Sequence, residues 1–143
     1  MTGGLAAGDR LGDAPLSSAL DGHASTLLQT LDGKRHSLLL LPGKDSESLS
    51  RLIMVAEETN QAFPGILAAH LILKRKTANP DAASSGLAVW VDTEARAHEQ
   101  LHANEATLIL VRPDGYIGFR CQPADGTSLR AYMQSYLIPA KAA

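Results

Sequence analysis

Cysteine is nearly absent from this sequence, with Cys121 as the single one among 143 residues. One cysteine excludes an internal disulfide, a C-x-x-C redox pair and a zinc site built from several thiolates of one chain. The first residues also lack the basic start and apolar stretch that are typical of a signal peptide. We therefore expect a protein of a reducing compartment, the cytoplasm.

Aromatic residues, excess charge and long apolar runs are also scarce. Aromatic residues make up 4% of the chain, so the core must be built from Leu, Ile, Val and Ala. Thirteen Lys and Arg residues against fifteen Asp and Glu residues give a net charge of −2, which does not favour a nucleic-acid partner. The strongest apolar stretch, 66–73, is interrupted by His70 and is far shorter than the roughly 18 residues of a membrane helix, so no membrane partner is expected.

Phosphate-binding and nucleophile motifs are missing as well. The chain contains no G-x-G-x-x-G, no G-x-x-x-x-G-K-[ST] and no G-x-S-x-G nucleophile elbow. We therefore expect no cofactor bound by this chain, and we identify no catalytic machinery in it.

Apolar runs and turn residues divide the chain into alternating strands and helices. A short helical turn is predicted at 25–31. Strands are predicted at 37–41, 65–73, 87–91, 107–112 and 116–120, with a loop at 74–85. Helices are predicted from Asp45 or Ser46 to about 62, from Asp92 or Thr93 to about Ala103, and from Thr127 or Ser128 to about 138.

The order of these elements predicts a fold class. Strands that alternate with helices pair in parallel through right-handed crossovers, and a hairpin at 107–120 adds an antiparallel edge. This is the thioredoxin-like α/β arrangement, with a mixed central sheet, helices on both faces and a terminal β-hairpin plus helix. We predict a lead-in or linker end at 1–14, one domain at 15–138 and a tail at 139–143.

The residues that carry redox chemistry in a thioredoxin are not present. A thioredoxin needs two cysteines at the start of its first long helix, and a peroxiredoxin needs one there. Here the equivalent stretch, 42–47, reads PGKDSE, and the stretch 104–107 before the hairpin reads NEAT without proline. Cys121 lies at the end of the hairpin, so we predict an inert, partly buried thiol with an ordinary pKa.

The stretch His98-Glu99-Gln100-Leu101-His102 matches H-E-x-x-H, the zinc-hydrolase motif. On one helix face His98 and His102 would bind zinc, and Glu99 would activate a metal-bound water. The predicted helix is short and polar, and no third histidine follows at the required spacing. A solvated helix face is the favoured interpretation, and no metal is expected.

The last predicted helix has one apolar stripe at helical spacing: Leu129, Tyr132, Met133, Tyr136 and Leu137. Such a stripe usually packs on its own sheet. It is also wide enough to reach beyond the sheet, and Tyr and Met are favoured at interfaces. Tyr132, Met133 and Tyr136 are therefore candidate interface residues for a homodimer.

The hairpin stretch Leu108–Arg120 reads LILVRPDGYIGFR. It resembles the C-terminal domain of FAD-dependent aromatic hydroxylases, the flavoprotein monooxygenases of the phenol, resorcinol and polyketide hydroxylase type. In that family V-R-P-D-G-Y or V-R-P-D-G-H joins the two strands. The opening from Gly8–Arg10 through Ala14–Leu16 is similar too, and the resemblance covers about residues 8–138.

This resemblance implies a non-catalytic, structural C-terminal domain of an aromatic-ring monooxygenase. It implies FAD and NAD(P)H for a parent enzyme, a flavin-binding domain as partner, and subunit contacts. The signature turn is Arg112, Pro113, Asp114, Gly115 and Tyr116. Hairpin geometry alone is the favoured explanation of these residues, and Arg112 would either pair with Asp114 or reach a partner. Two alternatives stay open: a free-standing thioredoxin-like protein that acts through Cys121, and a zinc hydrolase that acts through His98, Glu99 and His102.

Overall fold

The structure is a computed structural model that describes residues 8–19, 22–42, 49–74 and 87–136. None of the helices in these ranges has the length and apolar character that crossing a membrane requires. The helix start predicted at Asp45 or Ser46, most of the loop predicted at 74–85, and the tail at 139–143 lie outside the described residues.

Seven strands and four helical segments make up the described chain. The strands are β1 (Pro15–Ser18), β2 (Ala24–Thr26), β3 (His36–Leu41), β4 (Leu67–Leu73), β5 (Ala88–Val91), β6 (Thr107–Val111) and β7 (Ile117–Cys121). The helices are the 3₁₀ turn η1 (Leu28–Thr30), α1 (Leu49–Ala62), α3 (Arg96–Gln100) and α4 (Gly126–Tyr136).

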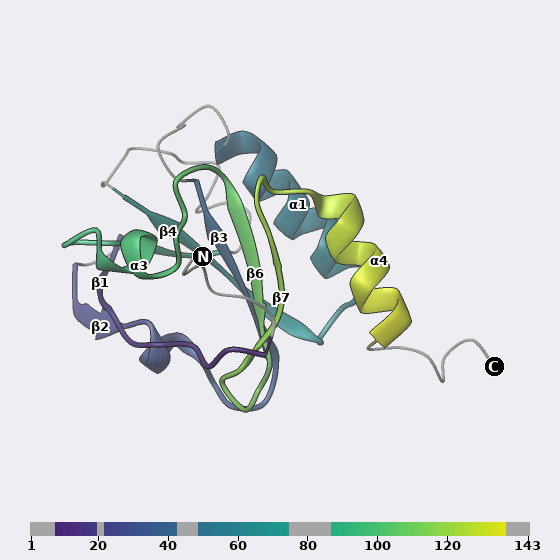
Figure 1. Ribbon diagram of the computed structural model, residues 1–143, viewed down its shortest axis with the longest axis horizontal. Coiled ribbons are helices and arrows are strands. Elements are labelled where there is room, and N and C mark those ends of the chain that lie inside the picture. Colours follow the sequence, from purple (N-terminus) through teal and green to yellow (C-terminus); the bar gives the residue numbers. More distant parts are fainter. Residues whose placement is uncertain (1–7, 20–21, 43–48, 75–86, 137–143) are drawn as a thin grey trace.

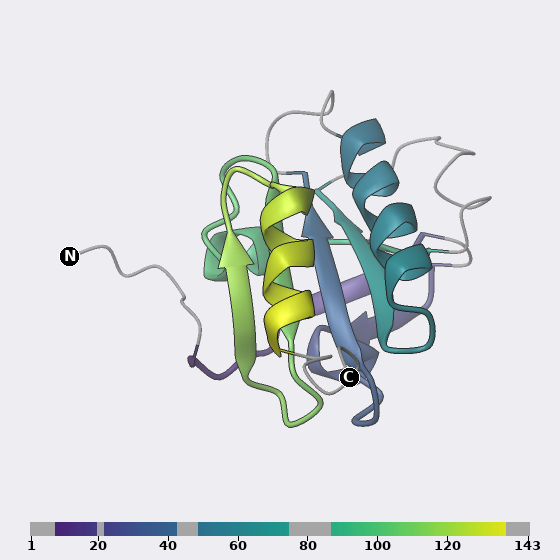
Figure 2. The same cartoon turned by 90° about the vertical axis from the view of Figure 1, so that its right-hand side faces the viewer.

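The strands form one mixed sheet in the order β2-β1-β5-β4-β3-β6-β7. β3, β4 and β5 are parallel, and every other pair is antiparallel. Helices α1 and α4 lie side by side on one face, and α3 lies on the other (Figures 1 and 2). The predicted mixed sheet with helices on both faces and a terminal hairpin plus helix is therefore confirmed.

Two apolar clusters cover the two faces of the sheet. Leu38 and Leu40 of β3 point into the cluster beneath α1 and α4, and Leu39 and Leu41 point into the cluster beneath α3. All four side chains are fully buried. A strand that is buried on both faces needs apolar residues at every position, which explains the continuous run of leucines.

The hairpin formed by β6 and β7 follows its sequence signal closely. Arg112 forms an ion pair with Asp114, as predicted, and Gly115 has a φ of +89°, which a residue without Cβ adopts without strain. A register irregularity lies between Leu110 and Val111 of β6. Formation of the hairpin is therefore enough to explain why these residues are present at the turn.

The beginning of the domain departs from the prediction. Residues 25–31 were expected to form a helical turn, but Ala24–Thr26 is a strand paired with β1, and the helical turn is limited to η1. The backbone N–H of Leu27 donates to the carbonyl of Ala14, so a contact distant in sequence determines this conformation. The predicted turn is wrong over its first residues because the spacing of apolar residues along the chain carries no information about a contact with a distant segment.

Part of the predicted lead-in packs on the sheet. Leu11 is 1% exposed and belongs to the core beneath α3. The N–H of Ile117 in β7 donates to the carbonyl of Asp9, and the N–H of Gly8 donates to the carbonyl of Ile117. This segment lies along the edge strand β7 over part of its length. The domain boundaries at 15 and 138 stay predictions.

The start of α4 is fixed by Asp125 rather than by Thr127 or Ser128. The Asp125 carboxylate accepts hydrogen bonds from the backbone N–H groups of Thr127 and Ser128 and from the Ser128 hydroxyl. These bonds and the adjacent helix N-terminus hold the pKa of Asp125 below its usual value. The predicted capping residues therefore lie two and three residues too late in the sequence.

Candidate functional site

Cys121 is the last residue of β7, opposite Leu108 of β6. Its side chain is half-buried and packs against the core beneath α1 and α4. The Sγ–H group donates a long hydrogen bond of 3.8 Å to the carbonyl of Asp125, which immediately precedes α4. The thiol is thus accessible from one side only, beside the first turn of a helix.

Burial raises the pKa of the Cys121 thiol. The negative charge of Asp125 adds to this effect, while the positive charge of Arg120 opposes it. The prediction of a partly buried thiol is in keeping with this geometry, but the predicted ordinary pKa is wrong. A raised pKa keeps the sulfur protonated and weakly nucleophilic at neutral pH.

The loop between α3 and β6 is held by side chains of β7 and the residue that follows it. One terminal nitrogen of Arg120 donates to the carbonyls of Leu101 and His102, both at 3.2 Å. Gln122 donates to the same His102 carbonyl at 2.8 Å and to the Thr107 hydroxyl at 2.6 Å. Sequence reasoning missed Arg120 and Gln122, because their partners are 15 to 20 residues away.

The first histidine of the H-E-x-x-H motif belongs to a buried hydrogen-bonded pair. His98 Nδ1 lies 2.9 Å from Asp92 Oδ2, and the two side chains are 3% and 0% exposed. The same carboxylate accepts the backbone N–H groups of Ala97 and His98, so Asp92 caps α3. Burial alone would raise the pKa of Asp92, but the hydrogen bonds from His98 and Ala97 outweigh it and lower the pKa.

The other motif residues do not join His98. Helix α3 ends at Gln100, shorter than predicted, and His102 has a φ of +55° and an exposed side chain. Glu99 is also exposed. Within the described part of the chain, no group of three His, Cys, Asp or Glu residues could hold a metal ion. The helical i, i+4 arrangement on which the zinc interpretation depends is not formed.

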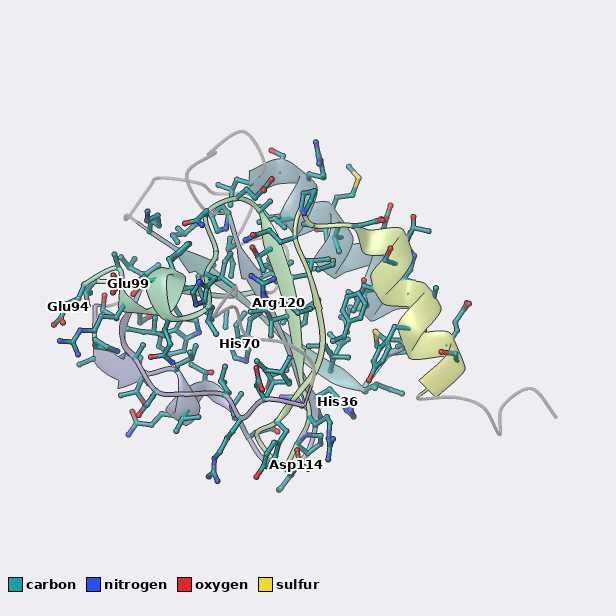
Figure 3. The ribbon with its side chains drawn as sticks, in the orientation of Figure 1. His36, His70, Glu94, Glu99, Asp114 and Arg120 are labelled. Atoms are coloured by element: carbon teal, nitrogen blue, oxygen red, sulfur yellow. The ribbon has the colours of Figure 1, made fainter. Side chains whose placement is uncertain are left out.

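The signature turn lies at one end of the sheet, where Figure 3 labels Asp114 and His36. The guanidinium carbons of Arg10 and Arg112 lie 5.8 Å and 5.9 Å from the centre of the Tyr116 ring, within range of cation–π attraction. The turn residues therefore contact the segment that precedes β1. Burial and the charge of Arg112 lower the pKa of His36 beside them.

The candidate interface residues of α4 differ from one another. Met133 is fully buried in the core beneath α4, together with Leu129. Tyr132 is half-buried, and its ring packs on Phe119 of β7 at 5.1 Å between ring centres. The Tyr136 side chain and Leu137 lie outside the described structure. The described part of the stripe serves the core of the domain.

Comparison with solved structures supports the fold. A thiol:disulfide interchange protein from Bacteroides sp. matches with a TM-score of 0.72 and 15% identity, over 96% of this chain and 93% of that one. A thiol peroxidase from Chromobacterium violaceum matches with a TM-score of 0.71 and 13% identity, over 92% and 88%. The thioredoxin domain of a thiol-disulfide oxidoreductase from Bacteroides vulgatus matches with a TM-score of 0.67 and 13% identity, over 90% and 98%.

These similarities establish the thioredoxin-like fold that the sequence predicted. No family model matches the sequence, and no curated protein matches it either.

The resemblance to the C-terminal domain of FAD-dependent hydroxylases is wrong. The similar structures named above are thiol peroxidase and thiol-disulfide oxidoreductase proteins, not parts of flavin-dependent hydroxylases. The predicted monooxygenase role, the implied FAD and NAD(P)H, and the flavin-binding domain as partner are overturned with it. The homodimer expected from the apolar stripe of α4 has no support from these structures. The VRPDGY match was misleading because these residues form a hairpin turn, and unrelated proteins share such a hairpin.

Proposed function

We propose that this chain is a free-standing thioredoxin-like protein of the cytoplasm that acts through Cys121, by exchange with disulfides of other molecules. The observation that carries the proposal is the position of Cys121 at the end of β7, half-exposed and beside the first turn of α4. The thioredoxin-like neighbours, named as thiol-disulfide and thiol peroxidase proteins, support thiol chemistry on this fold.

A single thiol can form a mixed disulfide with a partner molecule, but it cannot form a disulfide within its own chain. The deprotonated Cys121 sulfur attacks one sulfur of a partner disulfide and forms a mixed disulfide, while the other partner sulfur leaves as a thiolate. The chain has no second cysteine to resolve this product. A second thiol from another molecule must release Cys121 and restore the starting state.

The geometry favours slow exchange over peroxide reduction. A peroxidatic cysteine depends on a lowered pKa, whereas burial raises the pKa of Cys121. The start of the first long helix, where the chemistry of this fold is usually placed, has no cysteine in this chain. We therefore expect the rate of exchange to rise steeply with pH, as the thiolate fraction grows.

Intact-mass analysis after incubation with oxidised glutathione tests this proposal. At pH 9 the protein should gain one glutathione, and the rate should fall about tenfold for each pH unit towards pH 7, since it follows the thiolate fraction. The Cys121→Ser variant should gain none, and added dithiothreitol should remove the adduct. A folded protein that forms no adduct at pH 9, or one that reacts equally fast at pH 6, contradicts the proposal.

A further inference from the structure

The side chain of His70 is buried on the α3 face of the sheet, where it contacts Trp90. Successive residues of a strand point to opposite faces, so His70 shares the face of Ile72, which packs in the core beneath α3. His70 is 7% exposed. Trp90 Nε1 donates a hydrogen bond of 3.2 Å to His70 Nδ1. An imidazole nitrogen that accepts a hydrogen bond carries no proton, so this contact requires the neutral form of the ring.

Protonation would leave the His70 ring without suitable partners. In the charged form both ring nitrogens are donors, so the Nδ1–H group would face the Trp90 N–H group instead of accepting it. Nε2 is buried and has no hydrogen-bond partner in the described structure. Burial lowers the pKa of His70 to about 4. The hydrogen bond between His70 and Trp90 is therefore kept at neutral pH and must break when the ring takes up a proton.

The charged groups around His70 do not compensate for this loss. Arg35 and Asp32, from the turn before β3, act on the ring with opposite signs, and the effect of Arg35 is the larger. The Asp32 carboxylate is already engaged by the Arg35 side chain at 2.9 Å and by two backbone N–H groups of the same turn. β5 contains no titratable residue, and His36 of β3 lies away from His70 in Figure 3. Glu57 of α1 belongs to the opposite face of the sheet.

Trp90 connects His70 to the β1–β2 ribbon, which consists of Pro15–Ser18 and Ala24–Thr26 at one edge of the sheet. β1 joins β5 through two residue pairs, one of which includes Trp90, and one further backbone hydrogen bond lies beside them. This is the shortest strand pairing in the described sheet, whereas β5 joins β4 through four residue pairs. The ring of His23, just before β2, packs edge-on against Trp90 at 5.8 Å between ring centres. The ribbon thus depends on Trp90 for much of its attachment to β5.

We propose that His70 and Trp90 form an acid-sensitive latch, which holds the β1–β2 ribbon against β5 while His70 is neutral and releases it when His70 is protonated. Release of the Trp90 side chain lets water solvate the charged ring, which would otherwise stay buried without a partner. Leu16 of β1 is buried in the core beneath α3, so the ribbon stays attached at that point. The latch goes beyond thiol exchange, because β3 and β6 separate β4 from β7, the strand of Cys121.

An acid titration of the full chain tests the latch, because Trp90 is the single tryptophan of the sequence. From pH 7 to pH 3.5, quenching of its fluorescence by acrylamide should rise at least about twofold. Backbone amides of the ribbon should lose protection from hydrogen exchange at least about tenfold, after correction for the intrinsic effect of pH, while those of Leu39 and Ile109 keep theirs. Both changes should follow the protonation of His70, which the ¹⁵N shifts of its ring report.

Two results of this titration overturn the proposal. One is protonation of the His70 ring without a change in the quenching of Trp90 or in the protection of the ribbon. The other is loss of protection at Leu39 and Ile109 in the same step, because these residues lie in the central strands β3 and β6 and their exposure reports unfolding of the whole sheet.

Substitutions at both ends of the hydrogen bond assign the change to the latch. His70→Asn retains an oxygen acceptor for the Trp90 N–H and does not titrate, so the step should disappear. Trp90→Phe removes the donor, so the ribbon amides should be at least about threefold less protected already at pH 7. His23→Gln and Cys121→Ser are controls that should keep the step. A step that persists in His70→Asn or is lost in His23→Gln overturns the proposal. If His70→Asn does not fold, unchanged ribbon protection in Trp90→Phe overturns it.

Discussion

The two faces of the sheet are covered in different ways. On one face, α1 and α4 bury a cluster that is built from apolar side chains, with Leu52 and Leu129 fully inaccessible. On the other, a short α3, the turn η1 and the segment before β1 provide the cover (Figure 1). Buried or half-buried polar groups such as Asp92, His98 and Arg120 hold these pieces in place.

The two faces therefore differ in how their contribution to stability responds to pH. Apolar packing contributes free energy in proportion to buried area and does not respond to protons. Hydrogen bonds that buried carboxylates accept, or that buried histidines form, contribute to stability only while those groups stay in one protonation state. We therefore expect the α1/α4 face to dominate stability, and the α3 face to determine its dependence on pH.

The largest effect is expected on the apolar face, from Leu52→Ala in α1. Leu52 is fully buried, and removing its side chain should lower the free energy of unfolding by about 3–4 kcal/mol. Urea denaturation at pH 7 and pH 5 measures this value. The loss should be equal at the two pH values. The exposed Met54→Ala of the same helix, at 55% exposure, is the control and should cost less than about 1 kcal/mol.

The next effect is the pH dependence from His70. Its pKa falls from 6.5 in the unfolded chain to about 4 in the folded protein. Between pH 6.5 and about pH 4, His70 therefore binds a proton in the unfolded chain but not in the folded protein. Stability is complete above pH 6.5 and decreases as the pH falls towards 4, by roughly 3 kcal/mol. Urea midpoints from pH 7.5 to 4 should show this slope, and His70→Gln should flatten it. If His70→Gln kept the wild-type slope, a group other than His70 would be the cause of the pH dependence.

A smaller effect is expected from Asp92→Asn. The amide keeps one acceptor but loses the charge-assisted hydrogen bonds to the His98 ring and backbone, so the free energy of unfolding should fall by about 2 kcal/mol at pH 7. Because the pKa of Asp92 is lowered, its contribution persists above the unfolded value of 3.8 and is lost as the pH falls below it. Glu94→Gln, at an exposed ion pair, is the matched control. A loss no larger than in that control would contradict the capping role.

The smallest effect is expected at the start of α4. Asp125→Ala removes the acceptor of the Thr127 and Ser128 N–H groups and should lower the midpoint of thermal unfolding slightly, as is typical for the loss of a helix cap. Thermal unfolding by circular dichroism measures it. Ser128→Ala removes a single bond to Asp125 and should cost less. If Ser128→Ala cost more than Asp125→Ala, the cap would have to be reassigned.

Much of the fold was accessible from the sequence because its signals are local. The leucine run of β3, the turn of Pro113, Asp114 and Gly115, and the spacing of Leu129 and Met133 on α4 each predict an element without reference to the rest of the chain. The alternation of these elements then predicted the mixed sheet, because parallel strands need crossovers.

The sequence was less informative about function, because local signals do not distinguish proteins that share an element. The VRPDGY turn predicted a hairpin correctly and a flavoprotein family wrongly. The H-E-x-x-H match did not reveal that His98 pairs with Asp92, since a motif gives spacing along the chain and not the end of a helix at Gln100. Asp92 was expected as a helix cap, but its bond to the His98 ring was not.

By itself the sequence determined the order of strands and helices from β3 onward, the absence of a second cysteine and the apolar faces that must be buried. The tertiary structure alone decided that the segment before β1 packs on the edge of β7, that Arg120 and Gln122 hold the loop before β6, and that His70 is buried beside Trp90. The physical reason is that these contacts join residues far apart in sequence, so they exist only after the chain has folded.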